Sequence, residues 1–148
     1  MTAQLIDGKK IAAALRANIA KEIKSRSGRQ PGLAVILVGE DPASIIYVRN
    51  KRQACEEVGI KSFYHHLPST VTEDALKQLI FTLNNDTNVD GILLQLPLPL
   101  HINSDKMLDI ISPNKDVDGF HPTNLGLLAQ CRPFLRPCTP YGVMMLLD

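Results

Sequence analysis

The sequence lacks the features that mark several large classes of protein. It has no tryptophan, and its three cysteines, Cys55, Cys131 and Cys138, match no zinc or disulfide spacing. With 16 basic and 15 acidic side chains the net charge is +1, and no stretch gathers Lys and Arg into a nucleic-acid-binding face. No apolar run approaches the roughly 18 residues of a membrane span. We therefore expect a cytoplasmic protein with reduced thiols that binds no metal, nucleic acid or membrane.

Several catalytic and cofactor-binding motifs are also missing. The nine glycines never cluster, so neither a Gly-x-Gly-x-x-Gly turn nor a Walker A sequence occurs. If the protein uses a dinucleotide, its phosphate-binding turn is not in this chain. A Gly-x-Ser-x-Gly elbow and a His-Glu-x-x-His helix are absent too, which argues against hydrolase and metalloprotease sites of those types.

Strand-like and helix-like segments alternate along the 148 residues, a length that suits one domain. The apolar runs "LAVILVG" and "DGILLQLPLP" are typical of strands buried on both faces, and "IKSFYHHLP" is typical of a third strand. Helical periodicity marks three intervening segments, residues 9–27, 42–58 and 70–86. This alternation predicts an α/β three-layer domain with a mostly parallel sheet covered by helices.

Capping residues sharpen two of the predicted helices. Asp41 can cap a helix that begins at Pro42, and Gly59 can end it. For the next helix, Thr70 and Glu73 have the spacing of a capping box.

The last third of the chain is rich in Pro, Asn and Asp and carries shorter helical segments around residues 104–111 and 123–130. Near the C-terminus, Thr139 can cap a helix that begins at Pro140 and reaches Asp148 without an end signal. We therefore expect these 148 residues to be the front part of a longer protein, although a natural short form is an alternative.

The predicted helix over 42–58 contains one lysine in an apolar stripe. At about 100° per residue, Tyr47, Lys51, Ala54, Cys55 and Val58 fall within one arc. An uncompensated charge there is costly unless its pKa falls or a polar group meets it, and both conditions make a lysine usable for proton transfer. Alternatively, Lys51 extends its ammonium to water and Tyr47 is a core aromatic with a solvated hydroxyl.

Polar residues also interrupt the later segments. Gln95 lies near the carboxyl end of a predicted parallel strand, the end that lines the ligand crevice in open α/β sheets, although it could instead satisfy loop backbone groups. Asp116 and Asp118 lie on one side if their stretch is extended, and Gly119 allows a sharp turn. Such aspartates commonly form turns, whereas one in a pocket would suit a ligand with adjacent N–H donors.

Four stretches together resemble one enzyme family: "PASIIYVRNKRQACEEVGI", "DGILLQLPLP", "NKDVDGFHPTNLG" and "LRPCTPYG". They are similar, in order and spacing, to the bacterial bifunctional methylenetetrahydrofolate dehydrogenase/methenyltetrahydrofolate cyclohydrolases. The resemblance covers essentially the whole chain.

The resemblance implies roles for five residues. Ser44, Tyr47 and Lys51 match the family's Ser-x-x-Tyr-x-x-x-Lys helix, in which the tyrosine stacks on the folate and the lysine acts in proton transfer. Gln95 would hydrogen-bond the lysine and set its protonation state, and Asp118 would hold the N–H groups of the pterin ring. The implied catalytic residues are thus Lys51, Gln95 and Tyr47, and all five residues bind the substrate.

The resemblance also implies a domain division. Residues 1–138 would form the folate-binding catalytic domain, and residues 139–148 would begin a connecting helix towards an NADP-binding domain that this chain lacks. We expect the complete protein to oxidise 5,10-methylenetetrahydrofolate with NADP, to hydrolyse the product to 10-formyltetrahydrofolate, and to form a homodimer. The chain alone would lack dehydrogenase activity. The alternative is a non-catalytic folate-binding or dimerisation module.

Overall fold

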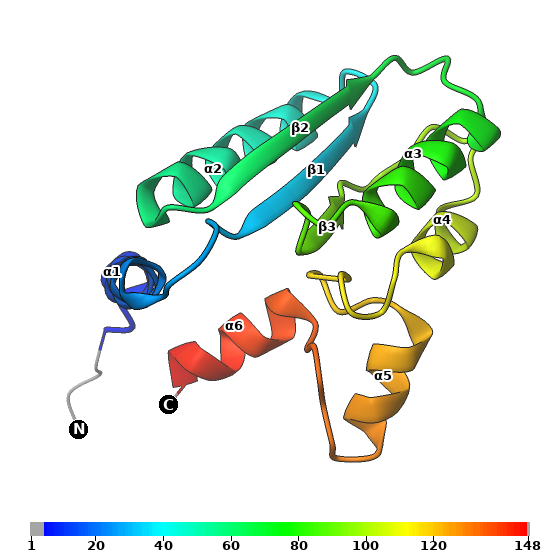
Figure 1. Cartoon of the computed structure of the whole chain (residues 1–148). Helices are drawn as coiled ribbons and strands as arrows, with labels where there is room; N and C mark the ends of the chain where they lie inside the picture. The colour runs from blue at the N-terminus through cyan, green and yellow to red at the C-terminus, as the bar shows by residue number, and fades with distance from the viewer. Residues whose placement is uncertain (1–4, 148) are drawn as a thin grey trace.

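A computed structural model describes residues 5–147 and contains a parallel sheet of three strands (Figure 1). The strands are β1 (Gly32–Val38), β2 (Lys61–Leu67) and β3 (Gly91–Leu94), in the order β2-β1-β3. β1 therefore lies in the centre, where it pairs with β2 along its whole length and with β3 from Leu33 to Ile36. The predicted parallel α/β architecture is confirmed.

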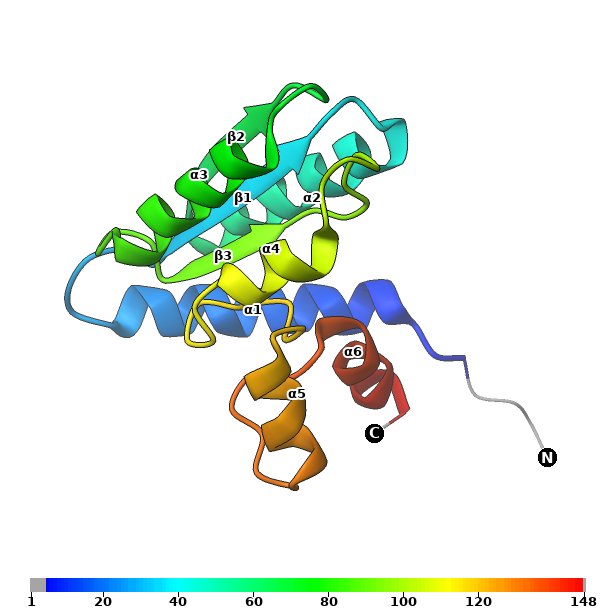
Figure 2. The ribbon, with the colours of Figure 1, turned by 90° about the vertical axis from the view of Figure 1, so that its right-hand side faces the viewer.

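Helices cover both faces of this sheet. They are α1 (Gly8–Ser25), α2 (Pro42–Val58), α3 (Glu73–Asn85), α4 (Ser104–Ile110), α5 (Pro122–Ala129) and α6 (Cys138–Leu147). One face carries α2 and the other carries α3 and α4, while α5 and α6 lie together beyond β3 (Figures 1 and 2). Between residues 5 and 147, no helix combines the length and the apolar character that crossing a membrane requires.

The two cores follow from the two-residue period of a strand. On β1, Ala34, Ile36 and Val38 face α3 and α4, where Leu76 and Ile80 are fully buried. The alternate β1 residues, Val35 and Leu37, pack on the other face against Val48 of α2 and Leu93 of β3. A central strand with apolar residues on both faces is what the continuous run "LAVILV" predicted.

The ends of α2 match the sequence prediction. The carboxylate of Asp41 accepts the Ser44 backbone N–H at 2.7 Å, and these hydrogen bonds hold the pKa of Asp41 below its ordinary value. At the other end, Gly59 has φ +87°, a left-handed conformation that glycine adopts without the penalty of a Cβ. The site-bearing helix is therefore fixed at both ends.

The predicted capping box of α3 is wrong. The helix begins at Glu73, and its cap is Thr72, two residues after Thr70, which accepts the Ala75 N–H at 3.2 Å. Glu73 instead accepts the backbone N–H of Asn103 at 2.9 Å, so its carboxylate ties α3 to the start of α4. The Glu73 carboxylate thus binds a backbone N–H thirty residues away instead of the N–H of Thr70 that a capping box would supply.

The predicted start of the last helix is also wrong. α6 begins at Cys138 rather than Pro140, since the Tyr141 N–H donates to Pro137 O at 3.1 Å and closes a turn that already contains Thr139. Pro140 is tolerated there because first-turn N–H groups have no partner within the helix. The short helices predicted around 104–111 and 123–130 are confirmed as α4 and α5.

Candidate active site

The polar residues that interrupt α2 and the third strand meet at the carboxyl end of β3. Lys51, on α2, donates from Nζ to Oε1 of Gln95 at 3.2 Å. Gln95 directly follows β3; its backbone N–H donates to Ile36 O at 2.9 Å and its side-chain Nε2 donates to Leu96 O at 2.7 Å. Gln95 is therefore fixed through both its backbone and its side-chain nitrogen, and its side-chain oxygen is available to Lys51. The Leu96–Pro97 peptide that follows is cis.

Asp118 adds a carboxylate to the same place. Burial raises its pKa above the ordinary value, the nearby charge of Lys51 opposes that rise, and the charge of Asp116 adds to it. An ammonium, an amide and a carboxylate thus converge from α2, β3 and the 113–121 loop. Together they can donate to and accept from one polar ligand and move a proton at it.

These three residues line one small cavity of about 160 Å³. Its other lining residues are Leu94, Leu96, Phe120, Cys138 and Thr139. Ligand pockets commonly measure roughly 300–1,000 Å³, so this one holds a single ring system rather than a whole large ligand. Cys138, Thr139 and Phe120 were not predicted to belong to the site; Cys138 and Thr139 lie in "LRPCTPYG", one of the stretches that resemble the enzyme family.

The other two predicted residues occupy different positions on α2. Ser44 is buried at 3 % exposure, whereas Tyr47 is 63 % exposed and neither lines the cavity. The buried stripe passes through Ser44, Val48, Cys55 and Val58, with Lys51 half-buried beside it. The predicted apolar arc was therefore misplaced: Tyr47 lies at its edge, one helical turn before Lys51.

Asp116 has a structural position rather than a place beside Asp118. The stretch turns instead of extending, and Asp116 is 2 % exposed. Its carboxylate accepts the backbone N–H of Gly119 at 3.1 Å, the N–H of His121 at 2.8 Å and Nδ2 of the buried Asn124 at 2.9 Å. These bonds compensate the buried charge and fix the turn that carries Asp118.

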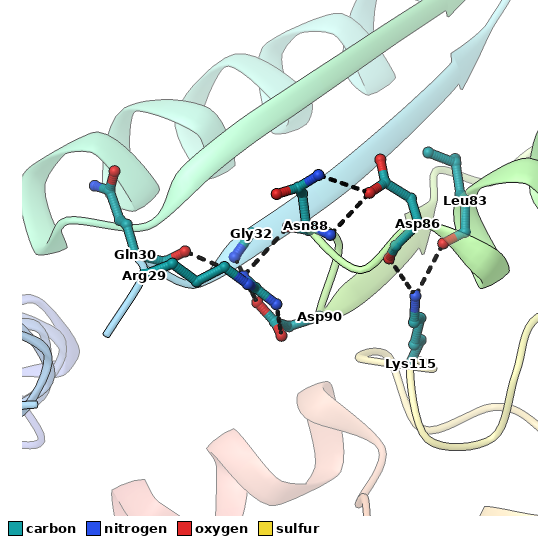
Figure 3. Close-up of polar contacts among 8 residues, drawn as sticks. All are labelled: Arg29, Gln30, Gly32, Leu83, Asp86, Asn88, Asp90 and Lys115. Atoms are coloured by element: carbon teal, nitrogen blue, oxygen red, sulfur yellow. Dashed lines mark hydrogen bonds and ion pairs between the residues drawn. The ribbon is translucent and has the colours of Figure 1, made fainter. Parts of the chain in front are cut away.

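The loop that carries Asp118 is anchored at its other end by Lys115 (Figure 3). Lys115 Nζ donates to Leu83 O at 3.0 Å and to Asp86 O at 2.8 Å, two carbonyls at the end of α3 that each also accept a backbone N–H. Beside it, Arg29 pairs through both terminal nitrogens with Asp90, at 2.7 and 2.6 Å. The amino end of the sheet is therefore a rigid base for the site loop.

A larger cavity of about 790 Å³ lies elsewhere, between the end of α1, the 26–31 loop and the end of α2. Arg29 and Asp90 line it and already pair with one another, and Glu57 is bound to Arg16 at 3.4 Å. Lys24, Gln30 and Glu56 also line it, but its charged residues Arg29, Asp90 and Glu57 are already paired within the protein. We therefore place the candidate site in the smaller cavity, which Lys51, Gln95 and Asp118 line together.

Fold and site define a class of protein: an α/β enzyme domain with a lysine, an amide and a carboxylate around a small cavity at the carboxyl end of a parallel strand. The sequence model described as tetrahydrofolate dehydrogenase/cyclohydrolase, catalytic domain, matches residues 6–118. The chain belongs to this family, which confirms the resemblance in its sequence.

Individual relatives agree. The chain is 57 % identical to the Bifunctional protein FolD of Legionella pneumophila (strain Paris), a match that covers 99 % of this chain and 53 % of the relative. The bifunctional FolD methylenetetrahydrofolate dehydrogenase/cyclohydrolase of Campylobacter jejuni superposes with a TM-score of 0.94 at 48 % identity, over 97 % of this chain and 52 % of that one.

A third relative was solved with ligands. The Trypanosoma brucei methylenetetrahydrofolate dehydrogenase-cyclohydrolase, complexed with NADP cofactor and inhibitor, superposes with a TM-score of 0.93 at 38 % identity, over 99 % of this chain and 52 % of that one. The chain thus spans about half the length of the relatives it matches.

Proposed function

We propose that this chain supplies the folate-binding catalytic part of a bifunctional enzyme. The complete enzyme would oxidise 5,10-methylenetetrahydrofolate to 5,10-methenyltetrahydrofolate with NADP and hydrolyse that product to 10-formyltetrahydrofolate. The contact between Lys51 Nζ and Gln95 Oε1 carries the proposal, because it places a proton-transfer group beside a fixed hydrogen-bonding partner in a cavity that Asp118 also lines.

In the hydrolytic step, Lys51 would act on the attacking water. Water adds to the methenyl carbon, and Lys51 takes one of its protons as the carbon–oxygen bond forms. As the carbon–nitrogen bond breaks, the lysine delivers that proton to the departing ring nitrogen, the hydroxyl oxygen becomes the formyl carbonyl, and its remaining proton is released to solvent, leaving the formyl group on the other nitrogen. Gln95 would orient Lys51 through the 3.2 Å hydrogen bond in both transfers.

Substrate binding would involve the other residues. The Asp118 carboxylate can accept hydrogen bonds from the adjacent amino and ring N–H groups of a pterin. The ring of Tyr47 is 63 % exposed one helical turn from Lys51, a position from which it could stack on the aromatic part of the folate. Ser44, buried in the first turn of α2, keeps its predicted role in substrate binding as part of this proposal.

NADP has no fitting site among these residues. Of the positive-φ glycines, Gly28, Gly39, Gly59 and Gly119 belong to separate turns, and none forms a phosphate-binding cradle with a neighbour. We accordingly assign no residue of this chain to NADP and expect the chain alone to lack dehydrogenase activity. Residues 1–138 would be the folate-binding unit, with a connecting helix from residue 139.

The wider setting is also a proposal. A product that carries a formyl group on a reduced folate suits cytoplasmic one-carbon transfer, including purine biosynthesis, and the complete enzyme would work as a homodimer.

Two measurements test the proposed function. The chain should bind 5,10-methenyltetrahydrofolate in a calorimetric titration, and the complete protein that carries this sequence should catalyse both NADP-dependent oxidation and methenyl hydrolysis. A folate-binding module without catalysis would bind but would not raise the hydrolysis rate above that in buffer. Absence of folate binding to both the chain and the complete protein would overturn the proposal.

A further inference from the structure

The segment Arg136–Thr139, called the strap here, crosses the loop that carries Asp118. Two hydrogen bonds join them at Cys138: its backbone N–H donates to Asp118 O at 3.3 Å, and its thiol donates to Val117 O at 3.1 Å. Cys138 also lines the cavity that contains Lys51, Gln95 and Asp118. One residue therefore holds two consecutive carbonyls of the site loop.

Backbone packing shows how closely the strap lies on this loop. Gly119 has φ +72°, and a Cβ placed there would come within 2.7 Å of three backbone atoms of Arg136 and Pro137. Pro137 is buried against the loop. The Asp118 segment is thus fixed by two sets of contacts: hydrogen bonds to the buried carboxylate of Asp116, and the packing of the strap backbone against Gly119.

We propose that Cys138 is a positioning residue, whose thiol and backbone N–H hold the 117–118 segment so that the Asp118 carboxylate faces the cavity and its ligand. The inference rests on the proposed function for the identity of that ligand, a reduced folate. The hydrogen bonds themselves belong to the fold and can be measured without any ligand.

The thiol has the properties of a donor rather than a nucleophile. Cys138 is exposed as a residue, but desolvation of its thiol, and then the nearby carboxylate of Asp118, raise the pKa of Cys138, so that the thiol keeps its proton at neutral pH. A protonated thiol can donate to Val117 O, whereas a thiolate would be repelled by that carbonyl. Serine at this position would donate in the same way, while alanine and valine would not.

A first experiment measures the position of Asp118 by carboxyl NMR titration. The groups that act on this carboxylate are Lys51 from α2, Asp116 from the same loop and Cys138 from the strap. While the strap is bonded to the loop, burial keeps the pKa of Asp118 raised; in C138A and C138V we expect this pKa to fall toward the ordinary value of an exposed aspartate as the loop moves into water. C138S should keep the raised value, and valine controls for lost volume.

The matched control is C131A, which removes another free thiol that is exposed. It should leave the Asp118 titration unchanged. An unchanged titration in both C138A and C138V would overturn the inference. Slow amide exchange of β1 serves as the check that each variant folds. If C138A and C138V fail this check, C138S becomes the deciding variant. A folded C138S in which the pKa of Asp118 is no longer raised would contradict the positioning role.

A second experiment couples Cys138 to folate through Asp118. C138A should weaken binding of 5,10-methenyltetrahydrofolate to the chain by about three- to ten-fold, the range expected for loss of one ordinary hydrogen bond. C138S should bind within about two-fold of the unsubstituted chain on the same scale. In a D118N background, C138A should add no further loss.

The outcomes separate the two proposals. Equal weakening by C138A in both backgrounds would show that Cys138 acts independently of Asp118 and would overturn the inference. If the unsubstituted chain bound no folate but the NMR titrations followed the expected pattern, the positioning role would stand and the proposed function would fall.

Discussion

Replacing Lys51 with methionine removes the proton-transfer group while keeping an unbranched side chain of similar length. General acid–base catalysis typically contributes 10²- to 10⁴-fold, so we expect methenyl hydrolysis by the complete protein to fall by at least about 100-fold, or roughly 2.7 kcal/mol in activation free energy. Folate affinity should change much less, because Tyr47 and Asp118 would still bind the substrate.

The effect on stability should be small. The variant loses the 3.2 Å hydrogen bond and leaves Gln95 Oε1 without Lys51, a cost of about 1–3 kcal/mol for a buried acceptor. Because Lys51 is only half-buried, water can replace part of that bond, and removing a partly desolvated charge offsets more of it. We therefore expect the free energy of unfolding to change by less than about 1 kcal/mol.

The assay follows the loss of methenyl absorbance at saturating substrate, with folate binding measured in parallel by calorimetry. K21M is the matched control, since it makes the same change at an exposed position of α1. If K51M hydrolysed the substrate within about three-fold of the unsubstituted rate, the loss would be no larger than that of one ordinary hydrogen bond. That result would exclude Lys51 from proton transfer. A large loss of folate affinity with normal turnover at saturation would instead assign it to binding.

Three other predictions concern stability. Since the pKa of Asp118 is raised in the fold, its own contribution to stability falls as pH rises through and above the ordinary carboxyl range, whereas the lowered pKa values of Asp41, Glu73, Asp86 and Asp90 act in the opposite direction; D118N should therefore raise the free energy of unfolding at about pH 7 more than at about pH 4, measured by urea unfolding, and an equal change at both values would contradict the raised pKa. T72A should lower the free energy of unfolding by about 1 kcal/mol and T70A by less than about 0.5; the reverse order would restore the predicted capping box. G119A should cost more than about 2 kcal/mol because its Cβ meets the strap backbone, whereas G126A in open helix surface should gain up to about 1 kcal/mol; equal melting temperatures would contradict the close packing.

The sequence predicted the elements whose signals are local. A continuous apolar run identified β1, and Asp41, Pro42 and Gly59 bounded α2, because a cap needs only residues within one turn of the helix end. The predictions failed where a distant residue competed. Glu73 bonds Asn103, thirty residues away, in place of the local capping partner.

The site divides in the same way. Lys51 and Gln95 were identifiable as polar residues in apolar segments, but their contact spans 44 positions and no spacing rule predicts it. The place of Tyr47 was misjudged because helical periodicity locates a stripe without fixing its centre. Cys138 was not predicted to belong to the site, because in the sequence it is one of three cysteines without a recognisable spacing. Its role depends on a hydrogen bond to Val117, 21 residues earlier in the chain.

The recessed position of the site follows from the shortness of β3. β1 continues to Val38, but its pairing with β3 ends where Ile36 meets Leu94, so β3 stops about 7 Å short of the β1 end. α2 starts beyond that end and runs back along the sheet, which brings Lys51 about 14 Å below the helix start. Gln95 follows Leu93 by two residues, and Leu93 packs on the face of the sheet that α2 covers, so the two-residue period directs the Gln95 side chain toward α2 and Lys51. Because the ladder between β1 and β3 ends one residue before Gln95, this contact forms short of the end of β1, inside the fold rather than at its rim.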